Sequence, residues 1–164
     1  MTTSLLADDA HTWVGRTQSY QPITVTEADI ARYALAIGAT DPVYFDGAEA
    51  RRAGHPAILA PRGFYMVLRF HAENLVALTN LGVDGTPPPF APPNEATRRM
   101  AGASTVSFRG DIYAGQVITL SSTITAIEEK SGRSGPLVIV SYQNDFVDQE
   151  STLLVRETYV RLLR

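Results

Sequence analysis

Few side chains in this sequence titrate near neutral pH or act as strong nucleophiles. Its 164 residues include three histidines, His11, His55 and His71, and no cysteine. Because histidine is the side chain that ordinarily titrates closest to physiological pH, acid/base chemistry would rest on these positions or on carboxylates. The lack of cysteine excludes a thiol nucleophile, disulfides and thiolate metal sites. We expect neither a metal ion nor a bound cofactor.

Two aspartates stand five residues apart, on either side of a predicted turn. Asp41 precedes Pro42, and Asp46 precedes the run 47–53, which predicts a short helix. Two neighbouring carboxylates are one way to build an acid/base catalyst, so Asp41 and Asp46 are catalytic candidates. The alternative is structural, because aspartate favours turns before proline and N-caps before helices.

The three histidines carry different expectations. His55 precedes a predicted long helix and is a further catalytic candidate; the alternative is a loop histidine held by local hydrogen bonds. His71 falls on the apolar stripe of that helix together with Phe64 and Leu68, which predicts a histidine in the core or at an interface. His11 lies near the N-terminus, and nothing in the pattern recommends it.

Composition and charge predict an ordinary folded protein. Hydrophobic residues make up 45% of the chain and charged residues 19%, with a net charge of -3. This balance provides no basic surface for nucleic acid or an anionic membrane. No secretory signal is recognisable, and no apolar run approaches the ~20 residues of a membrane span, so we expect a cytoplasmic protein. The length favours one domain over residues 1–164.

Helical signals fill the first half of the chain. The segment from Thr26 to Gly38 combines a capping-box start with apolar residues at helical spacing. A long amphipathic helix is predicted from Pro61 to about Asn80. Five of the ten prolines then fall between positions 87 and 93, which predicts a long Pro-rich loop at about 81–99.

Strand signals fill the second half. Apolar and polar residues alternate over 118–126, and runs rich in β-branched and aromatic residues cover 137–147 and 153–163. Short polar turns between them predict an antiparallel meander with one face to be covered. The long helix is the natural cover, so the predicted class is α+β, an antiparallel β-sheet wrapped around a long central α-helix.

Three stretches resemble the MaoC-like (R)-specific hydratase/dehydratase family, which has the hotdog fold. They are VTEADIARYALAIGATDPVYFD (25–46), GHPAILAPRGFYMVLRF (54–70) and the segment 108–160, which carries an "AG" turn and a K-x-G-R-x-G turn. The latter turn and an AP-x-x-F pattern are similar to the FAS1-like dehydratase branch. That branch includes the non-catalytic subunits of mycobacterial-type (3R)-hydroxyacyl-thioester dehydratases. The resemblance implies a single hotdog domain.

The same resemblance implies that the catalytic dyad of the family is missing. The family places an acid/base Asp and His five residues apart in a pattern resembling D-x-N-P-x-H, whose proline matches Pro42. On that register the Asp position holds Ala39 and the His position holds Tyr44. Alanine cannot titrate, and a tyrosine of ordinary pKa ~10 is a poor base at neutral pH.

The substrate-binding positions of the family are better matched in this sequence than its catalytic dyad. The resemblance places substrate-binding positions at Gly63 and Phe64, where the long helix starts, and at Tyr44. The first N–H groups of a helix suit a thioester oxygen that gains negative charge. Gly63 has the alternative role of letting the helix pack closely. Three arginines are candidates for the phosphates of coenzyme A or of a phosphopantetheine arm, unless they are simply solvated: Arg98, Arg99 and Arg109.

The leading hypothesis is therefore one subunit of a heteromeric (R)-specific 2-enoyl-thioester hydratase/3-hydroxyacyl-thioester dehydratase. Its partner would be a hotdog chain that bears the dyad, in a heterodimer or a dimer of heterodimers, and its substrate an acyl-CoA or an acyl carrier protein thioester. A homo-oligomeric protein that binds acyl thioesters without turnover is the alternative. A hotdog thioesterase is less favoured, because Glu73 is the only acid on the long helix.

Overall fold

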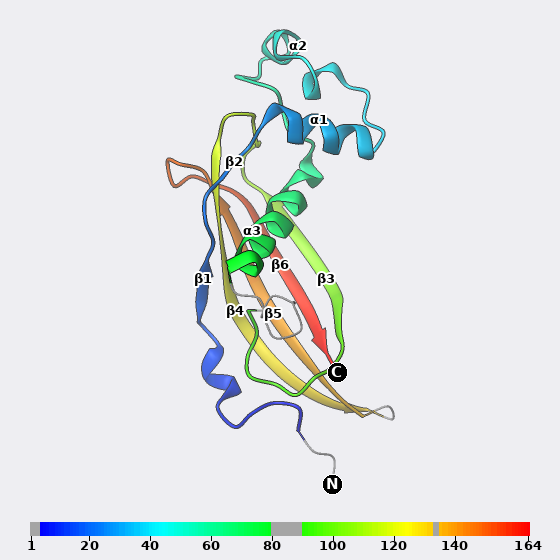
Figure 1. Cartoon of the computed structure of the whole chain (residues 1–164), viewed down its shortest axis with the longest axis vertical. Coiled ribbons are helices and arrows are strands. Elements are labelled where there is room, and N and C mark those ends of the chain that lie inside the picture. Colours follow the sequence, from blue (N-terminus) through cyan, green and yellow to red (C-terminus); the bar gives the residue numbers. More distant parts are fainter. Residues whose placement is uncertain (1–3, 80–89, 133–134) are drawn as a thin grey trace.

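The computed structural model describes residues 4–79, 90–132 and 135–164 (Figure 1). The helical elements come first in the chain and the long strands last. In chain order they are η1 (Ala10–Trp13), β1 (Thr17–Ser19), β2 (Ile23–Thr24), α1 (Glu27–Ala36), η2 (Pro42–Tyr44), α2 (Gly47–Arg52), η3 (Arg62–Phe64), α3 (Tyr65–Thr79), β3 (Arg99–Phe108), β4 (Val117–Gly132), β5 (Gly135–Val147) and β6 (Leu153–Leu163).

One antiparallel sheet holds the strands in the order β1-β4-β5-β6-β3, and β2 pairs separately with β4. The predicted meander is confirmed for β4, β5 and β6, which pair in sequence order. The earlier strand β3 instead pairs with the last strand, β6, and so forms the far edge of the sheet. The chain therefore crosses the sheet between β3, at one edge, and β4, which lies next to the opposite edge strand β1.

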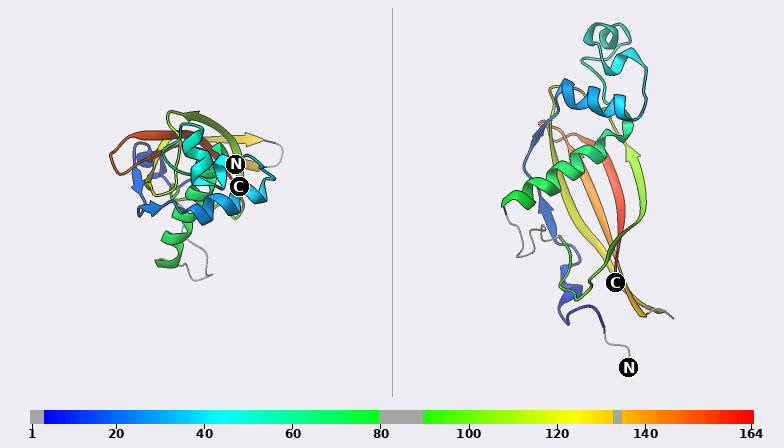
Figure 2. Two further views of the ribbon diagram at one scale, coloured as in Figure 1. Left: turned by 90° about the horizontal axis from the view of Figure 1, so that it is seen from above. Right: turned by 45° about the vertical axis from the view of Figure 1, so that its right-hand side comes forward.

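The long helix α3 lies across the inner face of this curved sheet, as predicted (Figures 1 and 2). Its side chains Leu68 and Ala72 are buried in one apolar cluster with Leu120 of β4 and Phe146 of β5. Burying this apolar surface is the main stabilising term, since each large aliphatic or aromatic side chain contributes roughly 1.5–3 kcal/mol. The arrangement confirms the predicted α+β class.

The helix starts later than predicted. Pro61 to Phe64 form a tighter turn in which the Phe64 N–H donates to the Pro61 carbonyl at 2.8 Å, and α3 proper begins at Tyr65. A short 3-10 turn before an α-helix is common and brings Phe64 into the core. Asn80, the predicted end, and the first part of the predicted Pro-rich loop lie outside the described residues. In the described part, 90–98, the chain forms an isolated bridge at Asn94, and β3 begins at Arg99.

The helices α1 and α2 lie beyond one end of the sheet (Figure 2). Thr26 caps α1 by accepting the Asp29 N–H at 3.1 Å, and Gly38 follows the helix in the left-handed region at φ 70°. Both features match the predicted helix. None of the helices in the described ranges has the length and apolar character needed to cross a membrane.

Candidate functional site

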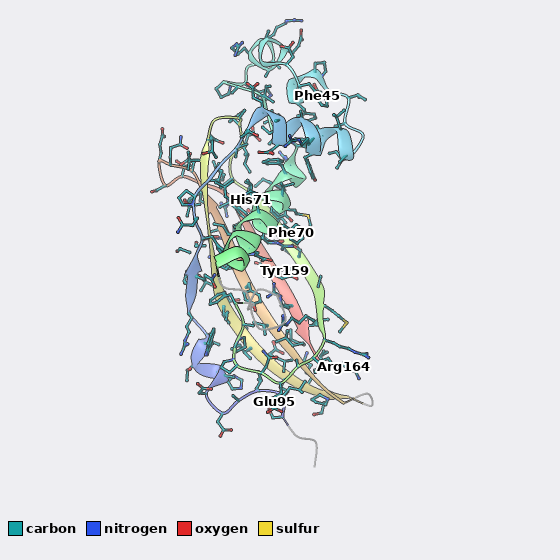
Figure 3. All side chains as sticks on the ribbon, in the orientation of Figure 1. Phe45, Phe70, His71, Glu95, Tyr159 and Arg164 are labelled. Atoms are coloured by element: carbon teal, nitrogen blue, oxygen red, sulfur yellow. The ribbon has the colours of Figure 1, made fainter. Side chains whose placement is uncertain are left out.

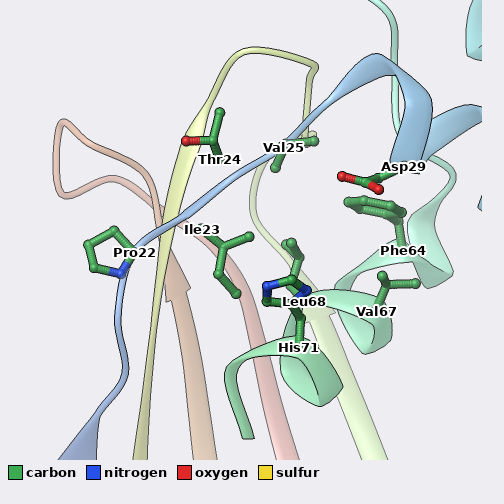
Figure 4. A pocket seen from close by; sticks show the side chains of 9 residues that line it. All are labelled: Pro22, Ile23, Thr24, Val25, Asp29, Phe64, Val67, Leu68 and His71. Atoms are coloured by element: carbon green, nitrogen blue, oxygen red, sulfur yellow. The ribbon is translucent and has the colours of Figure 1, made fainter. Parts of the chain in front are cut away.

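A pocket of about 230 Å³ lies between the chain before α1 and the first turns of α3 (Figure 4). One wall comes from the segment around β2, and the other from η3 and α3. Most of the residues that line it are apolar, and three of them have polar side chains: Thr24, Asp29 and His71. The lining residues are Pro22, Ile23, Thr24, Val25, Asp29, Phe64, Val67, Leu68 and His71.

Asp29 and His71 are the titratable residues of the pocket. The Asp29 carboxylate accepts the Thr26 hydroxyl at 2.6 Å and an Arg32 N–H at 3.3 Å, so it is already engaged in the cap of α1. His71 is exposed on α3, and its position on the stripe faces this pocket instead of the sheet, so the prediction that it lies in the core is wrong. Its alternative place at an interface stays a prediction. The described side chains hold no group of three or more His, Asp or Glu residues with metal-site geometry.

The two residues predicted at the helix start have different surroundings. Phe64 is buried and lines the pocket, and its ring packs edge-on against Tyr33 with a centroid distance of 5.8 Å. Gly63 faces α1, because a Cβ built there would overlap the Tyr33 hydroxyl. The close packing that was the alternative role of Gly63 is thus seen, against α1 instead of the sheet. The Phe64 N–H is already bonded to Pro61, so it is engaged within the turn.

Asp41 and Asp46 both act as caps. The Asp41 carboxylate accepts the Val43 N–H at 3.1 Å, and Asp46 accepts the Ala48 and Glu49 N–H groups at 2.6 and 3.1 Å. The hydrogen bonds from Glu49 and Ala48 lower the pKa of Asp46. A carboxyl of depressed pKa is poorly suited to donating a proton at neutral pH.

Tyr44 and Ala39, at the two dyad positions, lie in the segment that joins α1 to α2. Tyr44 ends the short turn η2 and is half-buried, and Ala39 donates its N–H to the Ala34 carbonyl at 2.9 Å. Neither residue lines the pocket. The structure does not bring Tyr44 together with Phe64 in that cavity.

His55 lies apart from the pocket and is hydrogen-bonded locally. Its Nδ1 is 3.3 Å from the Tyr113 hydroxyl, which donates to Asp111 at 3.3 Å. Burial and the nearby Asp111 carboxylate raise the pKa of Tyr113. This chain of contacts matches the local reading of a loop histidine.

The charged residues considered for phosphates or hydrolysis are dispersed. Arg98 and Arg99 lie at the start of β3 and Arg109 just past its end, roughly 33 Å away at the usual rise per strand residue. These arginines therefore do not form one phosphate site. Glu73 pairs with Arg161 at 3.9 Å and does not line the pocket.

A buried polar cluster under α3 was not among the predicted sites. Glu157 of β6, only 1% exposed, accepts Arg69 Nη1 through both carboxylate oxygens at 2.9 Å. Asn144 donates to Glu157 at 2.9 Å and accepts the Ser122 hydroxyl at 2.6 Å. We call these four buried residues, Ser122, Asn144, Glu157 and Arg69, the polar belt.

Two flanking hydroxyls complete the surroundings of Glu157. Ser104 donates to its carboxylate at 2.5 Å, and the Tyr65 hydroxyl donates at 3.5 Å. Burial, and then the charge of Glu157, raise the pKa of Tyr65. The Arg69 Nε is buried with no hydrogen-bond partner among the described residues.

Solved structures with the same fold include several hydratases and dehydratases. A monoamine oxidase regulatory protein from Archaeoglobus fulgius matches with a TM-score of 0.71 at 20% identity, over 92% of this chain and 90% of its own. The HadBC (3R-hydroxyacyl-ACP dehydratase) complex from Mycobacterium tuberculosis matches with a TM-score of 0.68 at 18% identity, over 93% and 97%. The ChsH1-ChsH2 complex from the same organism gives 0.65 at 19% identity, over 88% and 87%. The fold is therefore the hotdog fold, as predicted.

Sequence comparison also relates this chain to known proteins. A UPF0336 protein of Streptomyces griseus subsp. griseus is 30% identical over 145 residues, which cover 87% of either chain. The family model "FAS1-like, dehydratase domain region" matches residues 12–157, which include all the strands from β1 to β5 and the first part of β6. This protein belongs to the FAS1-like dehydratase domain family.

Proposed function

We propose that this chain is the non-catalytic subunit of a heteromeric (R)-specific 2-enoyl-thioester hydratase/3-hydroxyacyl-thioester dehydratase. The observation that carries the proposal is the pair Ala39 and Tyr44 at the dyad positions of a chain that belongs to a dehydratase family. A partner hotdog chain would supply the missing Asp and His. Two of the solved structures with this fold are named as complexes, HadBC and ChsH1-ChsH2, which supports a partner.

The reaction divides naturally between the two chains. Hydration needs a base to take a proton from water as its oxygen bonds to C3 of the enoyl group. It also needs an acid to deliver a proton to C2 and a donor for the thioester oxygen, which becomes enolate-like. The partner dyad would move the protons. This chain would contribute the apolar wall around Phe64 and Val67, against which an acyl group can lie.

The edge strand β3 is the favoured partner surface. A strand with one unpaired edge can add a further strand from another chain. The first seven residues of β3, from Arg99 to Thr105, are exposed. Met100 on β3 is 45% exposed, and Phe70, on α3, is 49% exposed and labelled in Figure 3. Exposed large apolar residues beside an open strand edge favour a second hotdog chain as the partner.

The decisive experiment measures activity with and without the partner. The chain is purified alone and together with a co-encoded hotdog chain that carries the dyad. Loss of the conjugated thioester absorbance of 2-butenoyl-CoA is then followed. We expect hydration by the complex and none by the chain alone. The complex in which the partner's catalytic His is replaced by Ala is the matched control, and it should be inactive.

Other outcomes would identify other functions. Hydration by the chain alone would overturn the proposal, and release of free thiol would identify a thioesterase. The variant Tyr44→His should stay inactive without the partner, because Ala39 still provides no titratable group. Hydration by that variant would show that the assignment of the dyad positions is wrong.

A further inference from the structure

The polar belt divides the inner face of the sheet into two apolar halves. Its strand residues are direct neighbours across the sheet, with Ser122 opposite Asn144 and Asn144 opposite Glu157. On each of these three strands the next inward residues on either side are apolar or aromatic. Towards the pocket they are Leu120, Phe146 and Val155, and on the other side they are Ile124, Tyr142 and Tyr159.

The pocket opens on only one of these halves. Phe64 and Leu68 line the pocket and belong to the same apolar cluster as Leu120 and Phe146. The second cluster, which includes Ile124 and Tyr142, contributes no residue to the pocket lining. A hydrocarbon chain that extends inward from the pocket, between α3 and the sheet, therefore meets the belt before it reaches the second cluster.

The residues of the polar belt form a continuous series of hydrogen bonds from the sheet to α3. Hydrogen bonds connect Ser122 to Asn144, Asn144 to Glu157, and Glu157 to Arg69 of α3, all at 2.6–2.9 Å. All four residues are at most 6% exposed. A hydrocarbon passing through would have to separate Arg69 from Glu157 inside the protein, and an uncompensated buried charge is strongly unfavourable.

We propose that the polar belt limits the length of the acyl group that this subunit accepts, so that its substrates are short-chain thioesters. The inference rests on the proposed function. The belt acts as a specificity barrier and takes no part in proton transfer. Arg69 and Glu157 are positioning residues in this sense, since they hold closed the space that a longer chain would occupy.

The direct test uses an apolar probe that needs no turnover. The triple variant Arg69→Leu, Asn144→Leu, Glu157→Leu replaces the belt with shorter or equally small apolar side chains, which a ligand can displace without stranding a charge. Dansyl-undecanoic acid is titrated into the full chain, and its fluorescence reports entry into an apolar site. We expect the variant to bind the probe at least about tenfold more tightly than the wild type, the effect of burying about two more methylene groups.

The matched control lies on the opposite face of the same strands. The pair Asp145 and Arg156 occupies the adjacent register position on β5 and β6, so Asp145→Leu with Arg156→Leu also removes two charges and leaves the belt intact. This control should bind the probe like the wild type. A second variant, Glu157→Gln, keeps the belt polar and should also exclude the probe, which makes the test independent of the triple variant. Circular dichroism confirms that each protein is folded.

The outcomes separate this inference from the proposed function. Equal probe binding by the wild type and the folded triple variant would overturn the belt as a barrier, whatever the activity of the complex. Tighter binding by Glu157→Gln to the same extent as by the triple variant would do so too. With the dyad-bearing partner, the wild type should favour 2-butenoyl-CoA over 2-dodecenoyl-CoA, and the triple variant should reduce that preference by at least about tenfold. Hydration of both substrates at equal rates by the wild type would overturn the barrier but leave the hydratase proposal standing.

Discussion

Strand β6 contributes two neighbouring residues, Arg156 and Glu157, to two different ion pairs on opposite faces of the sheet. The inner face holds Glu157, bonded to Arg69 of α3, with the two side chains only 1% and 7% exposed. The outer face holds Asp145 and Arg156, joined by two hydrogen bonds of 2.7 and 2.6 Å but 20% and 39% exposed. The outer pair has the shorter hydrogen bonds. We expect burial, and not the length of the hydrogen bonds, to decide which pair contributes more to the free energy of unfolding.

The largest effect is expected from removing one member of the inner pair. Glu157→Leu leaves the Arg69 guanidinium buried without its carboxylate, and it also removes the acceptor for Asn144 and Ser104. Breaking a buried pair in this way costs about 3–5 kcal/mol. Urea unfolding followed by circular dichroism measures the loss. A cost below about 1 kcal/mol would show that water reaches Arg69 and that the belt is open.

Removing both members of the inner pair should cost much less than the sum of the single changes. In the double variant Arg69→Leu, Glu157→Leu no charge is left unpaired, and buried pairs replaced by apolar residues are often close to neutral. We expect a coupling energy of about 2–3 kcal/mol in a double-mutant cycle. Additive costs would indicate that the two residues act through separate partners instead of through each other.

The outer pair should respond weakly to the same treatment. Asp145→Leu breaks a partly exposed, bidentate contact to Arg156, and such pairs contribute about 0–1 kcal/mol. Unfolding at low and at high salt should show a small cost that shrinks as salt rises. A cost equal to that of Glu157→Leu would contradict the dependence on burial.

The sequence predicts the elements of this fold only where they are long enough to show a pattern. Elements with a clear period are predicted correctly, namely α1 and the three long strands of the meander, although β4 extends beyond the predicted 118–126 to Gly132. The short helix α2 is predicted from the aspartate before it and not from a period. The strands β1 and β2, of three and two residues, are too short to show any period. In β3 the first seven residues are exposed, so the alternation that indicates a half-buried strand is missing.

The candidate site was predictable only in part, for a related reason. Phe64 follows from the apolar stripe of the helix, whereas the opposite wall of the pocket, 22–25, is an extended segment without a pattern of its own. The strand alternation does place Ser122, Asn144 and Glu157 on the inner face. Their meeting depends on the register between strands, which the sequence does not state, and on the rotation of α3 that brings Arg69 over the sheet.

A third carboxylate, that of Asp46, is exposed but accepts two hydrogen bonds, so it tests whether hydrogen bonds without burial affect the stability of the fold. The pKa of Asp46 is lowered from 3.8, first by the hydrogen bond from the Glu49 N–H and then by that from Ala48. Because the folded state holds the ionised form more tightly, Asp46 stabilises the fold above its unfolded pKa, and this contribution disappears as the pH falls through the lower folded value.

The wild type should therefore lose stability below about pH 4 slightly more than Asp46→Asn, whose amide oxygen can still cap α2 but does not titrate. Melting temperatures of the two proteins between pH 2 and 6, a range of about four units around the ordinary carboxyl pKa, measure the difference. Identical curves would mean that the cap is lost in solution. A difference as large as the effect of Glu157→Leu would mean that oriented hydrogen bonds, and not burial, account for the contrast between the two faces of the sheet.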